Sequence, residues 1–124
     1  AGVIDNRDYA IFQNWGYKGL YGGMTANDIH LCKGLKKSQK ILDHMGSTEL
    51  AANLFRATQT EEKLRRENIK GKIKANQTHY EVGKKVRQTI KELGGTMPED
   101  LPVADSIKSL ENKEKKKLKG NGDK

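Results

Sequence analysis

Residues 34–64 read GLKKSQKILDHMGSTELAANLFRATQTEEKL, and this stretch decides the fold. It opens with three lysines within residues 36–40, which give its start a positive charge. Gly46 is a typical helix end, so we expect one helix to finish there and the next to begin just after it. From residue 50 to 64 the apolar side chains recur at the spacing of an amphipathic helix. This stretch therefore predicts two consecutive helices.

The remaining chain also predicts helices. Asp5 and Thr25 are candidate N-cap residues, because their side-chain oxygens can accept hydrogen bonds from the free amides at a helix start. Strand signals are nearly absent, since no segment alternates apolar and polar positions over β-branched residues. We therefore predict an all-α fold, a small bundle of roughly four to six helices centred on a long antiparallel helical hairpin. The predicted helices span residues 5–20, 26–33, 35–45, 48–69 and 75–93, and the last two form the hairpin.

Two apolar stripes define the surfaces that this hairpin is expected to bury. The first follows helical spacing along one side of residues 48–69 and comprises Leu50, Leu54, Phe55, Ala57 and Leu64. The second recurs at steps of three and four along residues 75–93 and comprises His79, Val82, Val86, Ile90 and Leu93. We expect the two stripes to pack against each other. The alternative is that they exceed what one monomer can cover, so that they form a homodimer or dock onto another domain.

The composition favours a polyanionic partner. Lysine and arginine number 24 against 16 acidic residues, which gives a net charge of +8 and an isoelectric point near 9.6. This excess favours nucleic acid, an anionic membrane surface or an acidic protein as the partner. No apolar run approaches the ~18 residues that span a bilayer. The single cysteine, Cys32, excludes an internal disulfide and is typical of a reducing compartment, so we expect a cytoplasmic protein.

The predicted helix over residues 75–93 carries the clearest binding geometry. Lys84, Arg87 and Lys91 step by three and four, so they share a face roughly opposite Val82 and Val86. A basic ridge backed by a buried stripe suits contact with phosphate groups, although a plain solvated face is the simpler alternative. Neighbouring helices add further basic residues. The full candidate set for binding nucleic acid or a partner is Lys36, Lys37, Arg56, Lys63, Lys84, Arg87 and Lys91.

Aromatic residues near the N-terminus divide into two groups. Tyr17 and Tyr21 are flanked by glycines, so they are the candidates for stacking on bases or for contacting a partner. Tyr9, Phe12 and Trp15 are expected to anchor a small core, because they lie close together at helical spacing. The two tyrosines therefore join the candidate binding residues.

No residue set indicates catalysis, a metal or a cofactor. His30, Cys32 and His44 lack a fourth ligand and a Cys-x-x-Cys spacing, which argues against a metal site. His79 lies on the apolar stripe and is typical of a buried structural histidine. Residues 26–45 have helix–turn–helix spacing, but an ordinary helical hairpin is the favoured interpretation. We therefore predict a protein that is not an enzyme and that carries no catalytic, metal or cofactor site.

Four stretches resemble one family of proteins. They are residues 34–64, quoted above, with YAIFQN at 9–14, GLYGG at 19–23 and VRQTIKELGGTMPE at 86–99. Together they are similar to the C-terminal part of the bacterial DNA-damage-inducible protein D family of the SOS response. The resemblance implies that the chain continues from an N-terminal domain absent here. We expect a helical domain over residues 1–103 and a charged, loosely docked or disordered tail over 104–124.

The resemblance also implies a role in DNA damage. The family is associated with inhibition of the RecA recombinase on single-stranded DNA. Our leading hypothesis is a non-enzymatic module that binds nucleic acid, single-stranded rather than duplex DNA, or a RecA nucleoprotein filament, and modulates recombination. The alternative is a docking or oligomerisation domain without DNA contact, whose partners are the RecA filament, the N-terminal domain or a second copy. We expect a bacterial cytoplasmic protein that is nucleoid-associated when bound to DNA and does not contact membranes.

Overall fold

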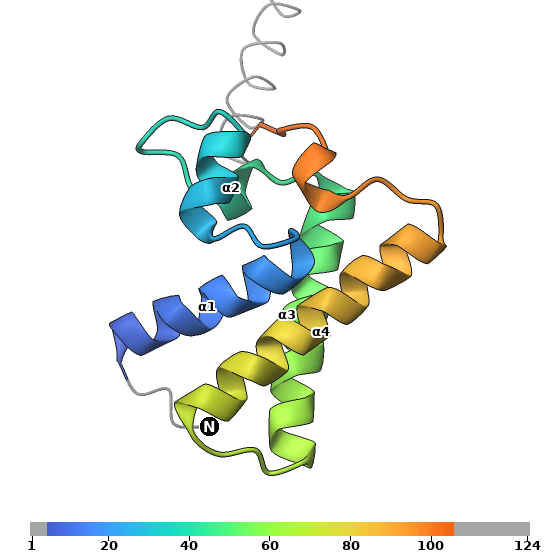
Figure 1. The fold of residues 1–124 in the computed structure, drawn as a ribbon. Coiled ribbons are helices and arrows are strands. Elements are labelled where there is room, and N and C mark those ends of the chain that lie inside the picture. Colours follow the sequence, from blue (N-terminus) through green and yellow to red (C-terminus); the bar gives the residue numbers. More distant parts are fainter. Residues whose placement is uncertain (1–4, 106–124) are drawn as a thin grey trace, which may run out of the picture.

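A computed structural model describes residues 5–105 of the chain (Figure 1). This part is all-helical, as predicted. Its elements are α1 (Asn6–Leu20), α2 (Ala26–Cys32), η1 (Ile41–His44), α3 (Ser47–Arg66), α4 (Lys72–Glu92) and η2 (Pro98–Asp100), where η denotes a 3₁₀ helix. Within the described residues there is no β-strand, and one isolated antiparallel bridge pairs Met45 with Val103. The predicted tail over residues 104–124 falls almost wholly outside this range.

The first two helices begin where the capping signals predict. The Asp5 carboxylate accepts a hydrogen bond from the Asp8 amide at 2.7 Å and caps α1. Thr25 and Asp28 form a capping box at the start of α2. The Thr25 hydroxyl accepts from the Asp28 amide, and the Asp28 carboxylate accepts from the Thr25 amide at 2.9 Å. These caps satisfy amides that the helices themselves cannot pair, which fixes the two helix starts.

Helices α1 and α4 cross at close range because glycines occupy the crossing point (Figure 1). A methyl group at Gly19 would lie 2.3 Å from the carbonyl oxygen of Tyr80. At Gly83 it would lie 2.7 Å from the carbonyl oxygen of Gly16. Real carbon atoms do not approach backbone oxygens this closely, so the contact requires residues without a side chain. Both Gly16 and Gly19 are buried within α1.

Helices α3 and α4 follow each other and cross at an angle (Figure 1). Their connection turns at Gly71, whose φ of 89° lies in the left-handed region that glycine adopts without strain. Helix α3 is continuous from Ser47 to Arg66, close to the predicted span of residues 48–69, and α4 begins three residues before the predicted start. That this pair forms the centre of the bundle stays a prediction.

The apolar core lies between α1, α2 and α4 rather than on α3. Its buried members are Tyr17, Leu20, Tyr21, Ile29, Met45 and Val86. The first predicted stripe was wrong in part, because Leu54 and Phe55 are 56% and 55% exposed. Of the second stripe, His79 and Val86 are buried as predicted, whereas Leu93 is 80% exposed. Helix α3 supplies none of the fully buried apolar residues, and only its partly buried Leu50 and Ala52 pack against this core.

Helix α3 instead turns polar side chains inward. Glu49, Asn53, Arg56 and Thr60 are each about 2% exposed or less. Their steps of four, three and four place them on one helical face. Burying such groups is costly unless each finds a hydrogen-bond partner. The inward face of α3 must therefore be matched by polar groups on the elements that cover it.

Residues 35–45 do not form the predicted helix. Only η1, Ile41–His44, is helical in this stretch, so no helix–turn–helix is formed over residues 26–45. Local hydrogen bonds explain the difference. The Lys36 amide donates to the Gln39 side chain at 2.7 Å, and the Nε2 atom of His30 donates to the carbonyl oxygens of both residues at 2.9 Å. These bonds stabilise a turn against the helix, because they use the groups that a helix would pair internally.

Candidate nucleic-acid interface

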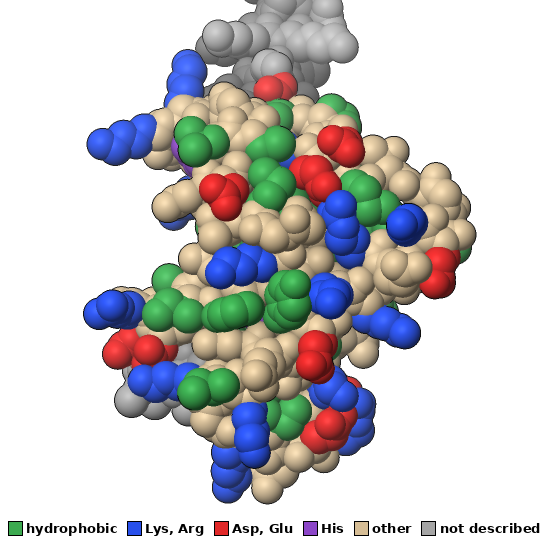
Figure 2. Space-filling view, viewed as in Figure 1, with side chains coloured by type: hydrophobic (Ala, Val, Ile, Leu, Met, Phe, Trp, Pro, Cys, Tyr) green, Lys and Arg blue, Asp and Glu red, His purple; other side chains and the backbone are tan. Residues whose placement is uncertain are grey.

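A group of aromatic rings and lysines lies on the surface where α1 crosses α4. We call Trp15, Lys18, Tyr80 and Lys84 the aromatic–lysine cluster. The Trp15 and Tyr80 rings meet edge to face, with centroids 5.8 Å apart and planes inclined by 87°. The Lys18 ammonium lies 4.4 Å from the centre of the Trp15 ring, and the Lys84 ammonium lies 5.3 Å from the centre of the Tyr80 ring. Figure 2 shows hydrophobic side chains with basic ones beside them where α1 and α4 cross.

Local geometry builds each half of the cluster. Lys18 follows Trp15 by three residues on α1, and Lys84 follows Tyr80 by four residues on α4, so each pair shares one helical face. The glycine crossing then brings the two halves together. Edge-to-face ring pairs contribute about 0.5–1.5 kcal/mol, and an exposed cation–π contact about 0.5–1 kcal/mol. These contacts favour an arrangement in which two partly exposed rings and two ammonium groups lie together.

Comparison with known proteins identifies the family of the chain. The DinD C-terminal domain family matches residues 1–110. The chain belongs to this family. It is 70% identical over 113 residues to the DNA damage-inducible protein D of Escherichia coli (strain K12). The matched residues make up 90% of this chain and 41% of that relative. The chain thus spans less than half the length of the curated relative it matches. No solved structure matches it.

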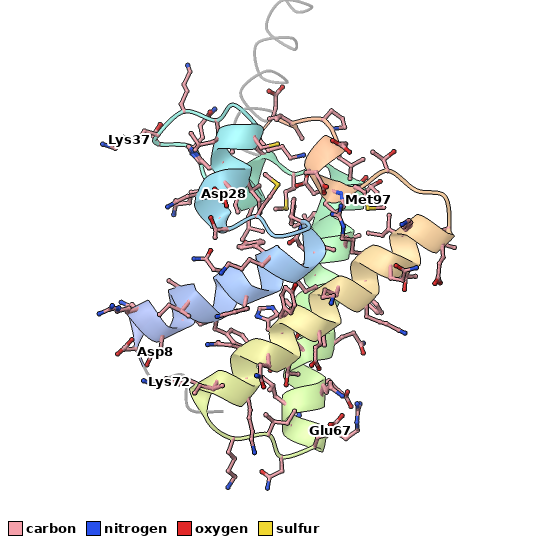
Figure 3. The ribbon with its side chains drawn as sticks, in the orientation of Figure 1. Asp8, Asp28, Lys37, Glu67, Lys72 and Met97 are labelled. Atoms are coloured by element: carbon pink, nitrogen blue, oxygen red, sulfur yellow. The ribbon has the colours of Figure 1, made fainter. Side chains whose placement is uncertain are left out.

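The seven basic residues predicted from the sequence are spread over this DinD C-terminal domain. Lys36 and Lys37 lie on the exposed loop after α2. Lys63 lies near the end of α3 and pairs with Glu67 at 2.6 Å. In Figure 3, Lys37 and Glu67 lie at opposite ends of the molecule. A single ligand patch therefore does not include both regions.

The predicted ridge on α4 is divided by an internal ion pair. The two terminal nitrogens of Arg87 donate to the two carboxylate oxygens of Glu99, both at 2.8 Å, and Arg87 also donates to the Leu20 carbonyl at 3.1 Å. The hydrogen bonds with Glu99 raise the pKa of the guanidinium. Arg87 thus joins α4 to α1 and η2, which corrects its assignment to a free basic ridge. Lys84 and Lys91 are exposed.

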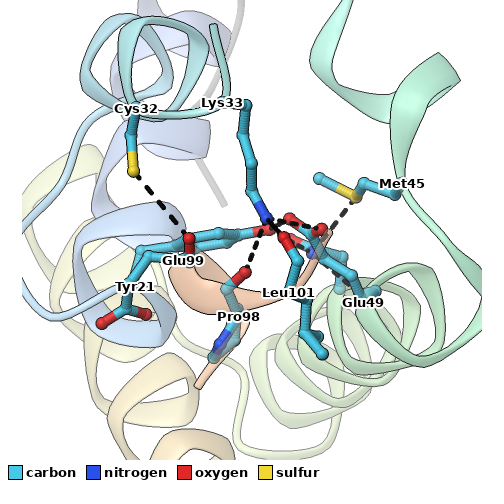
Figure 4. A network of polar contacts seen from close by, with 9 residues as sticks. Tyr21, Cys32, Lys33, Met45, Glu49, Pro98, Glu99 and Leu101 are labelled. Carbon is cyan, nitrogen blue, oxygen red and sulfur yellow. Dashed lines mark hydrogen bonds and ion pairs between the residues drawn. The ribbon is translucent and has the colours of Figure 1, made fainter. Parts of the chain in front are cut away.

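Tyr21 is a buried structural residue rather than a surface stacking platform, because its hydroxyl belongs to a polar network around Glu49 (Figure 4). It donates to one carboxylate oxygen of Glu49, and the Lys33 ammonium lies 3.1 Å from the other. Lys33 also donates to the carbonyl oxygens of Pro98 and Leu101, at 2.9 and 2.5 Å. The network therefore ties the end of α2 to α3 and to η2.

Arg56 and Tyr17 are also buried, which corrects their assignment as surface binding residues. The Arg56 guanidinium stacks over the Tyr17 ring at 5.0 Å and donates to the Asn53 side chain at 3.2 Å and to Nε2 of His79. Burial lowers the pKa of Arg56, and it raises that of Tyr17. The polar network thus continues through Arg56 and anchors the inward face of α3. Neither side chain is available to a ligand in this conformation.

His79 completes the network as the buried structural histidine that was predicted. Its Nδ1 donates to the Phe12 carbonyl at 2.8 Å, and its Nε2 accepts from Arg56. One ring nitrogen donates and the other accepts, so the ring is neutral. Burial, with the Arg56 charge beside it, lowers the pKa of His79 to about 4. A polar chain therefore runs unbroken from α1 through α4 to α3.

Of the predicted set, only Lys84 belongs to the aromatic–lysine cluster. Sequence reasoning missed Lys18 and Tyr80 and placed Trp15 in the core. The available signal was an aromatic residue followed by a lysine at helical spacing, three residues apart at 15/18 and four apart at 80/84. What the sequence does not display is that three glycines bring these pairs together. Within residues 5–105 no group of three or more His, Cys, Asp or Glu side chains could hold a metal ion, and no helix is long and apolar enough to cross a membrane.

Proposed function

We propose that this domain is a non-enzymatic module of the DNA-damage response that binds single-stranded DNA, free or within a RecA nucleoprotein filament, and thereby modulates recombination. The name of the relative, a DNA damage-inducible protein, supports the response to which the domain belongs. The observation that carries the binding assignment is the aromatic–lysine cluster.

Single-stranded DNA exposes two features that this cluster can recognise together. Its bases are unpaired, so each offers an aromatic face that stacks on a side-chain ring, worth about 1–3 kcal/mol per base. Its phosphates are spaced along a flexible backbone and attract ammonium groups. Trp15 and Tyr80 supply the rings, and Lys18 and Lys84 supply the charges within about one side-chain length of them. A duplex conceals its base faces, so the cluster favours the single strand.

Removing the two lysines tests the proposal by a change in salt dependence. Fluorescence anisotropy of a labelled oligothymidylate measures affinity at two or more salt concentrations, beside the matching duplex. Each phosphate contact on a single strand contributes about 0.7 to the log–log slope, so Lys18→Gln with Lys84→Gln lowers the slope by about 1.4. Lys74→Gln is the matched control, because Lys74 is an exposed lysine of α4 outside the cluster.

Two further outcomes decide the proposal. Trp15→Leu, which removes a stacking surface and leaves the charge intact, weakens binding without changing the salt slope. Equal affinities of the wild-type protein and the double lysine variant at low salt would contradict the assignment. A complex with the RecA filament that withstands salt and nuclease would then favour protein docking as the function of this domain.

A further inference from the structure

A groove separate from the aromatic–lysine cluster lies in the angle between α3 and α4. Helix α3 contributes one face at steps of four, four and three residues, and α4 contributes the facing side chains. The groove encloses about 250 Å³. It is lined by Phe55, Gln59, Lys63 and Arg66 from α3 and by Val82, Lys85, Val86 and Thr89 from α4.

The lining divides into an apolar floor and a basic rim. Phe55, Val82 and Val86 form the apolar part, and Phe55 is 55% exposed. Lys63, Arg66 and Lys85 supply three cations, and no acidic side chain lines the groove. Leu54, which precedes Phe55, is 56% exposed and extends the apolar surface beyond the groove. Exposed apolar residues that gather beside a hollow mark binding surfaces more often than scattered ones do.

The size of the groove indicates what it can hold. About 250 Å³ is below the roughly 300–1,000 Å³ of typical small-molecule and cofactor sites. It suits one or two apolar side chains that project from a partner's backbone. An amphipathic helix presents side chains in this way, because residues three and four apart lie on one face.

We propose that this groove docks an acidic amphipathic segment of a partner protein. The segment inserts apolar side chains against Phe55 and Val82 and places carboxylates against Lys63, Arg66 and Lys85. Charge complementarity selects this occupant, because every charged residue in the lining is basic. A nucleic acid strand has no aliphatic side chains to fill the apolar floor.

Two other occupants are disfavoured by charge. The C-terminal segment of this chain, SIKSLENKEKKKLKGNGDK at 106–124, is rich in lysine and would be repelled by the basic rim. A second copy that paired through the same groove would bring the three cations against their own equivalents. Like charges placed directly opposite each other destabilise an interface.

The existing ion pairs of the rim do not prevent docking. Lys63 pairs with Glu67 at 2.6 Å, and Arg66 pairs with Glu62 and Glu67. These pairs lie on the exposed surface of α3, where an ion pair is worth only about 0–1 kcal/mol. Carboxylates from a partner can therefore replace or share them at small cost.

A displayed library of short random peptides, selected on the wild-type 124-residue chain, tests this inference. Enriched peptides are then synthesised with a fluorophore and titrated against variants. Phe55→Gln removes the apolar contact and Lys85→Glu reverses one rim charge. Because Phe55 is half-exposed, its replacement leaves the fold intact. Leu93→Gln and Lys91→Glu are matched controls, since both change exposed residues of the same kinds outside the groove.

The expected result is enrichment of peptides that combine acidic residues with apolar residues three or four apart. Their affinity falls about tenfold or more in Phe55→Gln and in Lys85→Glu, and is unchanged in both controls. Enrichment of basic peptides, or equal binding to Phe55→Gln and wild type, would overturn the inference. So would displacement of bound peptide by an oligonucleotide, or a wild-type dimer that sedimentation shows to dissociate in Phe55→Gln. None of these outcomes depends on Lys18 or Lys84.

Discussion

His79 is neutral in the folded protein because both of its nitrogens are committed. Nδ1 donates to the Phe12 carbonyl, Nε2 accepts from Arg56, and burial disfavours a second proton. Protonation would convert the acceptor into a donor that faces another donor. The charge of the ring and the stability of the domain are therefore coupled.

The pKa of His79 predicts a pH dependence of stability. Its folded pKa of about 4 lies below the ordinary value of 6.5, so the unfolded chain takes up the proton first as pH falls. The stabilisation is complete above about pH 6.5 and is lost as pH falls towards 4. At about 1.4 kcal/mol per pKa unit, the full loss is roughly 3.5 kcal/mol, and about 2.5–3 kcal/mol of it is reached between pH 4.5 and pH 4.

Urea unfolding at pH 7 and at pH 4.5 measures this loss. The comparison is with His79→Gln, which cannot titrate and whose amide supplies both a donor and an acceptor. Acidic groups elsewhere titrate in both proteins, so the difference between the two isolates His79. The same drop in unfolding free energy in wild type and variant would show that this histidine does not couple to pH.

Single residues also show what the sequence can and cannot predict. The caps Asp5 and Thr25 were predictable, because capping depends on neighbours within three residues. Arg56 was not, because an arginine on a helix is ordinarily exposed. Its burial depends on Asn53, His79 and Tyr17, and two of these lie on other helices. Contacts between residues a few positions apart can be predicted from the sequence, whereas polar contacts between different helices cannot.

At the scale of elements, the α1–α4 crossing depends on residues that helix propensity disfavours. Glycine within a helix costs about 1 kcal/mol relative to alanine, so propensity alone predicts that Gly83→Ala stabilises the domain. The crossing predicts the opposite, because a methyl group there would lie 2.7 Å from the Gly16 carbonyl oxygen and 2.9 Å from the Leu20 amide nitrogen. Backbone atoms of a packed helix cannot move aside as a flexible side chain can.

We therefore expect Gly83→Ala to lower the free energy of unfolding by about 1–3 kcal/mol, the usual cost of overpacking. Denaturant unfolding followed by circular dichroism measures the change. Gly46→Ala is the control for steric contact, since a methyl group there meets no atom within 4 Å, and any small loss it shows reflects the position of Gly46 as N-cap of α3, where alanine is disfavoured. A variant that gains stability at Gly83 would show that the helices separate easily. The aromatic–lysine cluster would then be less rigid than its geometry indicates.

Helix α3 explains why the predicted hydrophobic stripe was only partly buried. The helical period of its apolar residues was identified correctly, but its polar residues repeat with the same period on the opposite face. The apolar face carries Leu54 and Phe55, and the opposite face carries the buried polar stripe from Glu49 to Thr60. Pattern alone assigns the apolar face to the core. Here Lys33, Tyr21 and His79 provide partners for the polar face, and these contacts join segments far apart in the chain.

At the scale of the whole molecule, the domain presents two different chemistries on separate surfaces. The aromatic–lysine cluster combines rings with ammonium groups at the α1–α4 crossing. The groove combines an apolar floor with a basic rim between α3 and α4. They share no residue. The net charge of +8 predicted a polyanionic partner in general, but the fold was needed to divide that charge between surfaces suited to different anions.

This separation predicts that a single strand and an acidic peptide bind independently. Trp15 is the one tryptophan of the chain and lies in the cluster, so its emission reports ligands stacked there. Oligothymidylate is expected to quench this emission, and a groove-binding acidic peptide is expected to leave it nearly unchanged.

The peptide should alter the affinity for the oligonucleotide by less than about twofold, because coupling requires a shared element that both ligands bias. Titration of each ligand with and without saturation by the other measures this coupling. Quenching by the peptide, or mutual exclusion of the two ligands, would mean that both occupy one surface and that the groove is an extension of the strand-binding site.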